Sequence, residues 1–140
     1  MKDKAFLDTN LFVYAVDSSQ GLRKKREIAR ELIRQHLQDA SGVISIQVAQ
    51  EFYHVSTHKI QTPLPTETAL EYLHHISVLE TVHADFGLIL RAIGLHQKHT
   101  MSFWDALIVE AARTAGCSYL FSEDLQDGFQ IGDMTVKNPF

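Results

Sequence analysis

The sequence is poor in cysteine, proline and tryptophan, because its 140 residues include one cysteine, three prolines and one tryptophan. A single cysteine, Cys117, excludes an intramolecular disulfide framework and a cysteine-based zinc or iron–sulfur site. The chain also lacks the apolar run of a signal peptide, and no stretch reaches the ~18 apolar residues of a membrane span. We therefore expect one cytoplasmic domain over residues 1–140, with no membrane contact.

Basic residues are too few for a polybasic nucleic-acid coat protein. Thirteen Lys and Arg oppose 17 Asp and Glu, which leaves a formal net charge of −4. Hydrophobic residues make up 45% of the chain and charged residues 21%, which is the balance of an ordinary globular protein. The acidic excess is too mild for a disordered acidic tail. The position of the acids along the chain is therefore more informative than their number.

Short apolar runs alternate with longer amphipathic segments along the chain. The expected strands lie at 5–7, 43–46, 76–79 and 118–121, with a weaker one at 134–136. The expected helices lie at 11–15, 22–37, 48–55, 66–73, 83–99 and 104–115. This alternation predicts β-α units around a parallel sheet. In such folds the functional site lies beyond the carboxyl ends of the strands.

Four acidic residues follow these strands or lie in the helices next to them: Asp8, Glu51, Asp105 and Asp124. Each has a purely structural interpretation as a turn residue, a helix cap or an exposed helix residue; Asp105, for instance, fits a capping box with Ser102. Glu51 and Asp105 nevertheless lie among apolar residues with few Lys or Arg nearby in sequence, and burying an unpaired charge is costly. A divalent cation would remove that cost, and an all-oxygen carboxylate set suits Mg²⁺ or Mn²⁺ rather than zinc.

The acids stand in four short motifs that resemble, in order and spacing, the acidic motifs of PIN-domain ribonucleases: Phe6-Leu7-Asp8-Thr9-Asn10, Gln50-Glu51-Phe52, Trp104-Asp105-Ala106-Leu107-Ile108 and Phe121-Ser122-Glu123-Asp124. The resemblance spans nearly the whole chain and is closest to the VapC-type toxins of type II toxin–antitoxin systems. It implies a three-layer α/β/α fold with a central parallel sheet of four to five strands. It also implies an Mg²⁺- or Mn²⁺-dependent endoribonuclease whose catalytic and metal-site acids are Asp8, Glu51, Asp105 and Asp124.

The resemblance implies further residues and partners. Asn10 and Ser122 match polar positions that support the site, whereas Asp127 lies three residues after Asp124 where many relatives have an acid two residues on, so its membership stays open. The implied partners are an RNA substrate, a cognate antitoxin whose segment blocks the acidic pocket, and a second copy in a homodimer. The expected chemistry is in-line attack on phosphorus by a water whose pKa the metal lowers, with no Ser or His nucleophile.

Basic residues concentrate in the segment 23–34, which contains six of the thirteen and begins with Arg23, Lys24, Lys25 and Arg26. Two interpretations stay open. The segment is either a solvated helix face with internal charge pairs or an edge that contacts RNA phosphates beside an acidic centre.

Histidines and aromatic residues offer weaker signals. His54 and His58 lie one helical turn apart, with Glu51 one turn earlier, but an exposed helix face is favoured over a zinc site because no further strong ligand set follows. We interpret Phe103 and Trp104 as core or interface residues rather than as platforms for base stacking.

Other α/β classes with clustered acids fit less well. A phosphoacceptor receiver domain would need an acidic pair at the first strand end and a Lys after the last strand, and a haloacid-dehalogenase-like phosphatase would need an acid where Asn10 stands. The alternative that stays open is a catalytically silent PIN-like module that binds RNA or a partner protein. RNA cleavage that requires Mg²⁺ and disappears with EDTA would distinguish the two.

Overall fold

The computed structural model describes residues 3–140, in which strands and helices alternate as the sequence predicts. The strands within that range are β1 (Ala5–Leu7), β2 (Gly42–Ser45), β3 (Glu80–Val82), β4 (Tyr119–Phe121), β5 (Gln130–Ile131) and β6 (Met134–Lys137). The helices are α1 (Thr9–Val16), α2 (Arg23–Gln38), α3 (Ile46–His58), α4 (Thr66–Ile76), α5 (Phe86–Lys98) and α6 (Phe103–Thr114).

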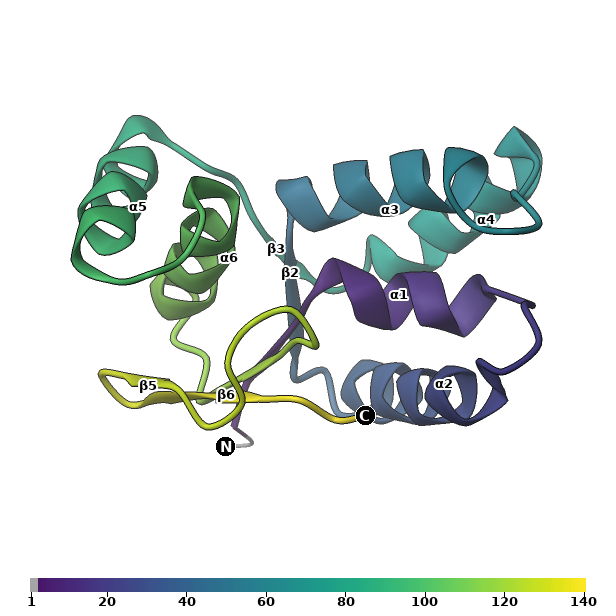
Figure 1. Ribbon diagram of the computed structural model, residues 1–140, viewed down its shortest axis with the longest axis horizontal. Helices are drawn as coiled ribbons and strands as arrows, with labels where there is room; N and C mark the ends of the chain where they lie inside the picture. The colour runs from purple at the N-terminus through teal and green to yellow at the C-terminus, as the bar shows by residue number, and fades with distance from the viewer. Residues whose placement is uncertain (1–2) are drawn as a thin grey trace.

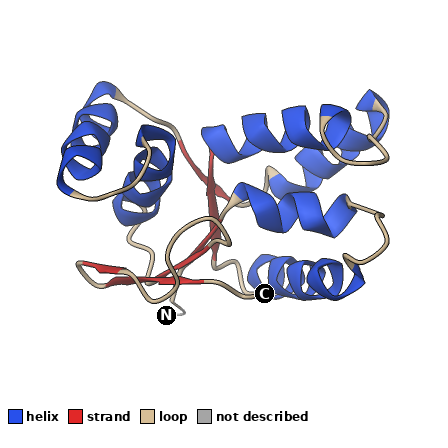
Figure 2. Ribbon diagram, viewed as in Figure 1, coloured by secondary structure: helices blue, strands red, loops and turns tan. Residues whose placement is uncertain are grey.

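The strands form one sheet in the order β3-β2-β1-β4-β6-β5, in which only β5 and β6 pair antiparallel. Helices α5 and α6 lie on one side of this sheet and α1 to α4 on the other (Figure 1), so the strands form the middle layer (Figure 2). The predicted three-layer α/β/α fold is confirmed. The sheet has six strands instead of the expected four to five because the two-residue β5 forms a short hairpin with β6.

The centre of the sheet contains the point at which its strand order reverses. From β1 the chain builds β2 and β3 on one side, then returns to add β4 on the other side of β1. The backbone N–H of Asp8 donates to the carbonyl of Phe121 at 3.1 Å, so the residues that follow β1 and end β4 are neighbours. Ligand sites in open α/β sheets form at the carboxyl ends of strands at such a reversal.

Side-chain caps start the helices that carry the acidic motifs. The Asp8 carboxylate accepts from the backbone N–H of Thr9 at 2.7 Å and caps α1, while Ser45 caps α3 directly after β2. Ser102 caps α6, and its hydroxyl accepts from the backbone N–H of Asp105 at 3.0 Å. Each such cap stabilises a helix by about 1 kcal/mol. The caps also place Asp8 and Asp105 at the helix starts, where their positions are well determined.

The prediction of a strand at 76–79 is wrong. Ile76 ends α4, and the strand begins four residues later, at Glu80. Ile76 and Leu79 are buried because they face the core from a helix end and a turn, which produces the same short apolar run as a strand. β3 lies at the sheet edge and its residues are exposed or half-buried, so it lacks the apolar signal by which strands are found.

The core lies between the sheet and its two helical layers. Phe6, Leu7 and Leu120 of the central strands are fully buried, and the rings of Phe12 and Phe52 pack edge to face with centroids 6.5 Å apart. Strands buried on both faces are expected in a parallel sheet that helices cover on each side. Within residues 3–140, no helix combines the length and the apolar character that crossing a membrane requires.

Candidate active site

The four predicted acids line one cavity of about 340 Å³. They come from four separate places in the fold, namely the β1–α1 junction, α3, the first turn of α6 and the loop after β4: Asp8, Glu51, Asp105 and Asp124. Asn10 lines the same cavity. Asp127 does not, because its carboxylate accepts from the backbone N–H of Asn138 at 2.8 Å and so contacts the C-terminal segment.

Asp8 is the most deeply buried of these acids, with 5% of its surface exposed. Its second carboxylate oxygen accepts from the Ser122 hydroxyl at 2.7 Å, and the same hydroxyl accepts from the backbone N–H of Asp124 at 3.1 Å. Burial raises the pKa of Asp8 to about 6; the hydrogen bonds from Ser122 and Thr9 lower this pKa, while the Asp124 and Glu51 carboxylates raise it. The fold therefore moves the pKa of the Asp8 carboxyl from its usual acidic range to just below neutral pH.

Two neighbours of Asp8 position two of the other three acids. The Thr9 hydroxyl donates to the Glu51 carboxylate at 2.7 Å, and the Asn10 amide nitrogen donates to Asp124 at 3.2 Å. Asn10 therefore lies where a supporting residue is expected. Sequence reasoning missed Thr9, although its place between Asp8 and Asn10 in one motif was the available signal.

Among the residues that the structure describes, these four carboxylates have no Lys or Arg partner. Glu110, another buried acid on α6, shows the contrast: it pairs with Arg113 at 2.8 Å and with Arg91 at 3.6 Å. Glu110 thus has guanidinium partners that offset its charge, which the four cavity acids lack within residues 3–140.

Similar surroundings raise the pKa of Asp105. Burial raises its pKa, the hydroxyl of Ser102 opposes that shift, and the Asp124 and Glu51 carboxylates raise the pKa further. Mutual repulsion among carboxylates favours either protonation or a bound cation.

The chemistry of the cavity suits a divalent cation. Its charged donors are all carboxylate oxygens, and the buried amide oxygen of Asn10 has no hydrogen-bond partner within residues 3–140. Hard oxygen donors of this kind suit Mg²⁺ or Mn²⁺. In the part of the chain that the structure describes, no three acidic, histidine or cysteine side chains form a preassembled metal site.

One of the predicted RNA-binding residues reaches the loop that carries Asp124. Lys25 donates to the Glu123 carboxylate at 2.9 Å, and the Tyr14 hydroxyl donates to the same carboxylate at 2.7 Å. Lys25 therefore ties α2 and α1 to the loop after β4. Neither Tyr14 nor Glu123 was singled out from the sequence, because their partners lie about a hundred residues apart along the chain.

The other three predicted RNA-binding residues differ in how free their side chains are to bind a phosphate. Arg26 donates to the backbone carbonyl of Asp17 at 2.7 Å, which commits it to the α1–α2 connection. Arg23 pairs with Glu27 at 3.1 Å across one exposed helical turn, and Lys24 is exposed. Exposed pairs of this kind contribute little stability and exchange readily for another anion.

The histidine and tryptophan interpretations have different outcomes. His54 and His58 stack with ring centroids 5.1 Å apart on the exposed face of α3, and neither lines the cavity with Glu51. Of the two interpretations of Trp104, as a core or an interface residue, the core alternative is wrong, because 63% of its surface is exposed and it lines the cavity wall. The interface alternative stays a prediction. Trp104 lies in the first turn of α6, whereas the adjacent Phe103 is half-buried and packs against the core.

We expect Ser122→Ala to destabilise the protein by about 1–3 kcal/mol at pH 8, because it removes a fully buried donor to a charged Asp8. The loss should be smaller at pH 5, where more of the Asp8 carboxyl is protonated. Urea denaturation at both pH values measures it, with Ser118→Ala near the other end of β4 as the control. Equal losses at the two pH values would contradict the coupling between Ser122 and Asp8.

Comparison with known proteins places this arrangement in a family. A chain of a toxin–antitoxin complex from Klebsiella pneumoniae has a TM-score of 0.70 and 17% identity, covering 98% of both chains. A chain of the DNA-bound VapBC from Salmonella typhimurium has a TM-score of 0.69 and 18% identity, covering 99% of this chain and 100% of that one. VapC20 of Mycobacterium tuberculosis, described as a sarcin–ricin loop cleaving toxin, has a TM-score of 0.63 and 16% identity, covering 84% and 87%.

At these identities the structural likeness establishes the fold. No curated protein sequence matches the chain. The sequence profile of the PIN domain, however, matches residues 5–129, which contain all four acidic motifs. The chain therefore belongs to the PIN domain family.

Proposed function

We propose that this protein is an Mg²⁺- or Mn²⁺-dependent endoribonuclease. The observation that carries this proposal is the convergence of four carboxylates, none ion-paired to Lys or Arg within residues 3–140, on one cavity of about 340 Å³. A divalent cation there would lower the pKa of a bound water and offset the charge of a phosphodiester.

In this proposal one set of residues would bind the cation and another set positions these ligands. Asp8, Glu51, Asp105 and Asp124 supply the carboxylate oxygens that would hold the cation. Ser122 and Thr9 hold Asp8 through hydrogen bonds of 2.7 Å each, and Asn10 holds Asp124. Rigid hydrogen bonds of this kind keep ligands oriented before the substrate arrives.

Removal of the metal provides the direct test. We expect purified protein to cleave single-stranded RNA in Mg²⁺, to stop when EDTA is added, and to resume when Mg²⁺ or Mn²⁺ is restored in excess. Gel analysis of an end-labelled RNA measures this, and sequencing of RNA ends identifies the sites. Cleavage that persists in EDTA would contradict the proposal, and tight RNA binding without cleavage would favour the silent binding module.

We further propose that the protein is the toxin of a type II toxin–antitoxin pair. Its fold matches that of chains from toxin–antitoxin complexes and of a sarcin–ricin loop cleaving toxin, and its acidic cavity is complementary to an Arg-bearing segment of a partner. The proposed assembly is a homodimer bound by its antitoxin. Co-purification with the product of the adjacent gene, and inhibition of cleavage by that product, would test the pairing.

The exposed beginning of α2 is proposed to contact RNA phosphates. Replacing Arg23 and Lys24 by Gln should weaken RNA binding several-fold. It should also make the negative slope of the logarithm of the association constant against the logarithm of the salt concentration shallower by about 1 to 2. A fluorescence titration at several salt concentrations measures both. The matched control replaces Lys59 and Lys98, which are exposed elsewhere, and should leave the slope nearly unchanged. Equal slopes in the two double variants would favour the solvated-face interpretation.

A further inference from the structure

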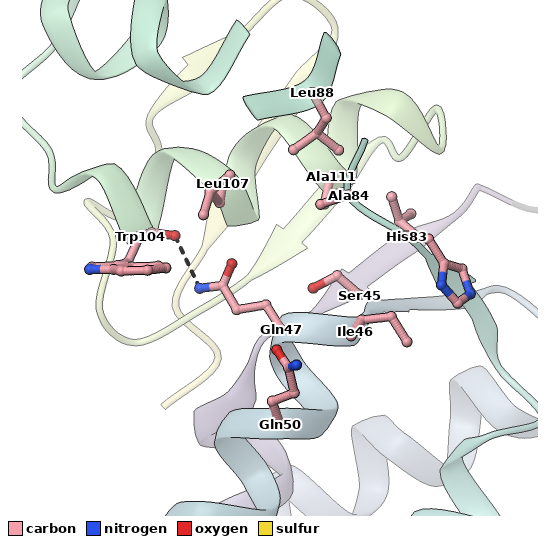
Figure 3. A pocket seen from close by; sticks show the side chains of 11 residues that line it. Ser45, Ile46, Gln47, Gln50, His83, Ala84, Leu88, Trp104, Leu107 and Ala111 are labelled. Carbon is pink, nitrogen blue, oxygen red and sulfur yellow. Dashed lines mark hydrogen bonds between the residues drawn. The ribbon is translucent and has the colours of Figure 1, made fainter. Parts of the chain in front are cut away.

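A second cavity, of about 330 Å³, adjoins the acidic one. The two cavities share Gln47 and Trp104, and Asp105, the residue after Trp104, lines the acidic cavity. The second cavity lies beyond the carboxyl ends of β2 and β3, between the start of α3 and α6 (Figure 3). A group bound there would sit directly beside the four acids. We call it the neutral cavity because no Asp, Glu, Lys or Arg lines it.

None of the residues that line the neutral cavity is Asp, Glu, Lys or Arg. Leu88, Leu107 and Ala111 provide apolar surface, while Ser45 and neighbouring amide and imidazole groups provide polar atoms. A phosphate would find no Lys or Arg here, and a wholly apolar group would leave the polar atoms unpaired. The cavity therefore fits an uncharged ligand that combines a flat apolar face with a hydrogen-bonding edge. Its volume is at the lower end of the range for small-ligand sites.

The polar atoms are available for such an edge. The Gln47 amide nitrogen donates to the carbonyl of Trp104 at 3.3 Å, and within residues 3–140 the Gln47 amide oxygen accepts no hydrogen bond. The exposed Gln50 amide has no hydrogen-bond partner within residues 3–140. Figure 3 shows Gln47 between Trp104 and Gln50, with His83 on the opposite side of the cavity. A glutamine amide presents a donor beside an acceptor, which is the pattern that pairs with the edge of a nucleobase.

Trp104 offers the flat surface. It is 63% exposed, and its ring contacts Phe103 edgewise with centroids 5.3 Å apart, so the core does not enclose it. Single-stranded RNA is recognised by stacking unpaired bases on aromatic side chains and by hydrogen bonds to their edges. An exposed indole between an acidic cavity and two amides meets both requirements.

We infer that the neutral cavity binds one unpaired nucleobase of the RNA, next to the phosphate that the acids would act on. Trp104 stacks on the base, and Gln47 and Gln50 bind its edge, which makes these residues determinants of sequence specificity. The inference rests on the proposed function for the position of the phosphate. Base stacking by Trp104 is not expected from the sequence, in which Trp104 stands among apolar residues. The exposure of its ring becomes visible only in the fold.

The tryptophan itself provides the assay. Trp104 is the one tryptophan of the chain, so intrinsic fluorescence reports on this cavity. The full chain carrying Asp8→Asn, in Mg²⁺, is titrated with a single-stranded RNA oligonucleotide and with an abasic oligonucleotide of the same length. We expect the RNA to quench the Trp104 fluorescence and to shift its emission maximum to the blue or narrow its emission band. The abasic oligonucleotide, which has the same backbone charge, should leave the intensity and the spectrum nearly unchanged.

Side-chain variants in the same Asp8→Asn background complete the test, with binding of fluorescein-labelled RNA followed by anisotropy. Trp104→Ala should weaken binding by about 5- to 150-fold, the range for loss of one base stack, and Trp104→Phe should restore most of it. Gln47→Ala and Gln50→Ala should change the preference among the four homopolymers. Gln35→Ala, an exposed glutamine on α2, is the matched control and should change neither.

The outcomes separate this inference from the proposed function. Equal quenching by the abasic oligonucleotide, or unchanged RNA binding by Trp104→Ala, would overturn the nucleobase site; so would a Trp104→Ala defect confined to binding a partner protein. If the unsubstituted protein cleaves RNA but quenching is absent, only the inference fails. If base-dependent quenching is present but no RNA is cleaved, the proposed function fails and the nucleobase site stands.

Discussion

Asp8→Asn should reduce RNA cleavage by about 10³-fold or more while the protein stays folded. The carboxylate lies 5% exposed among three other acids, and the amide that replaces it cannot carry the charge that would hold a divalent cation. The amide oxygen can still accept from the backbone N–H of Thr9, so the cap of α1 survives. The loss should therefore appear in the cleavage rate and not in the helical content.

A matched variant separates the site from the charge. Asp133→Asn makes the same chemical change at an exposed residue between β5 and β6 and should cleave RNA within about twofold of the unsubstituted rate. Single-turnover cleavage of an end-labelled RNA in Mg²⁺ measures both rates, and circular dichroism confirms the fold. Cleavage by Asp8→Asn at the unsubstituted rate would show that Asp8 is not part of the active site.

The same substitution should stabilise the metal-free protein, by about 3 kcal/mol at pH 8. Burial raises the pKa of Asp8 from 3.8 to about 6, so the folded protein binds this proton more tightly than the unfolded chain does. Stability is therefore lost as the pH rises from about 4 to about 6, and above that range ionised Asp8 imposes its full cost. Asn carries no charge at any pH and avoids that cost, as expected where a site is built for function rather than stability.

Urea denaturation in EDTA measures this effect as the difference in unfolding free energy between Asp8→Asn and the unsubstituted protein. The difference should fall to about half at pH 5, where part of the penalty is already relieved by protonation. Adding Mg²⁺ at pH 8 should stabilise the unsubstituted protein more than the variant. A variant that is less stable at pH 8, or a gain that does not change with pH, would mean that the buried carboxylate is not strained by its surroundings.

The acids of the candidate site were easier to predict from sequence than the edge strand β3. Asp8 and Asp105 could be found because they follow apolar runs or caps, and local patterns of this kind determine where helices and strands begin. β3 was misplaced because an edge strand lacks a buried face, and the run that ends at Leu79 belongs to a helix end and a turn. Local pattern reports burial, and it does not distinguish the elements that cause it.

The sequence by itself determined the β-α alternation, the order of the acidic motifs and the helix caps, because each depends on residues within a few positions of one another. Only the tertiary structure decided which side chains meet. It brought Thr9 to Glu51 and Lys25 to Glu123, directed Asp127 to the C-terminal segment, and left Trp104 exposed between two cavities. The reason is the sheet order, which sets β4 beside β1 although more than a hundred residues separate them. Contacts of that range depend on how the helical layers pack, and no local pattern encodes them.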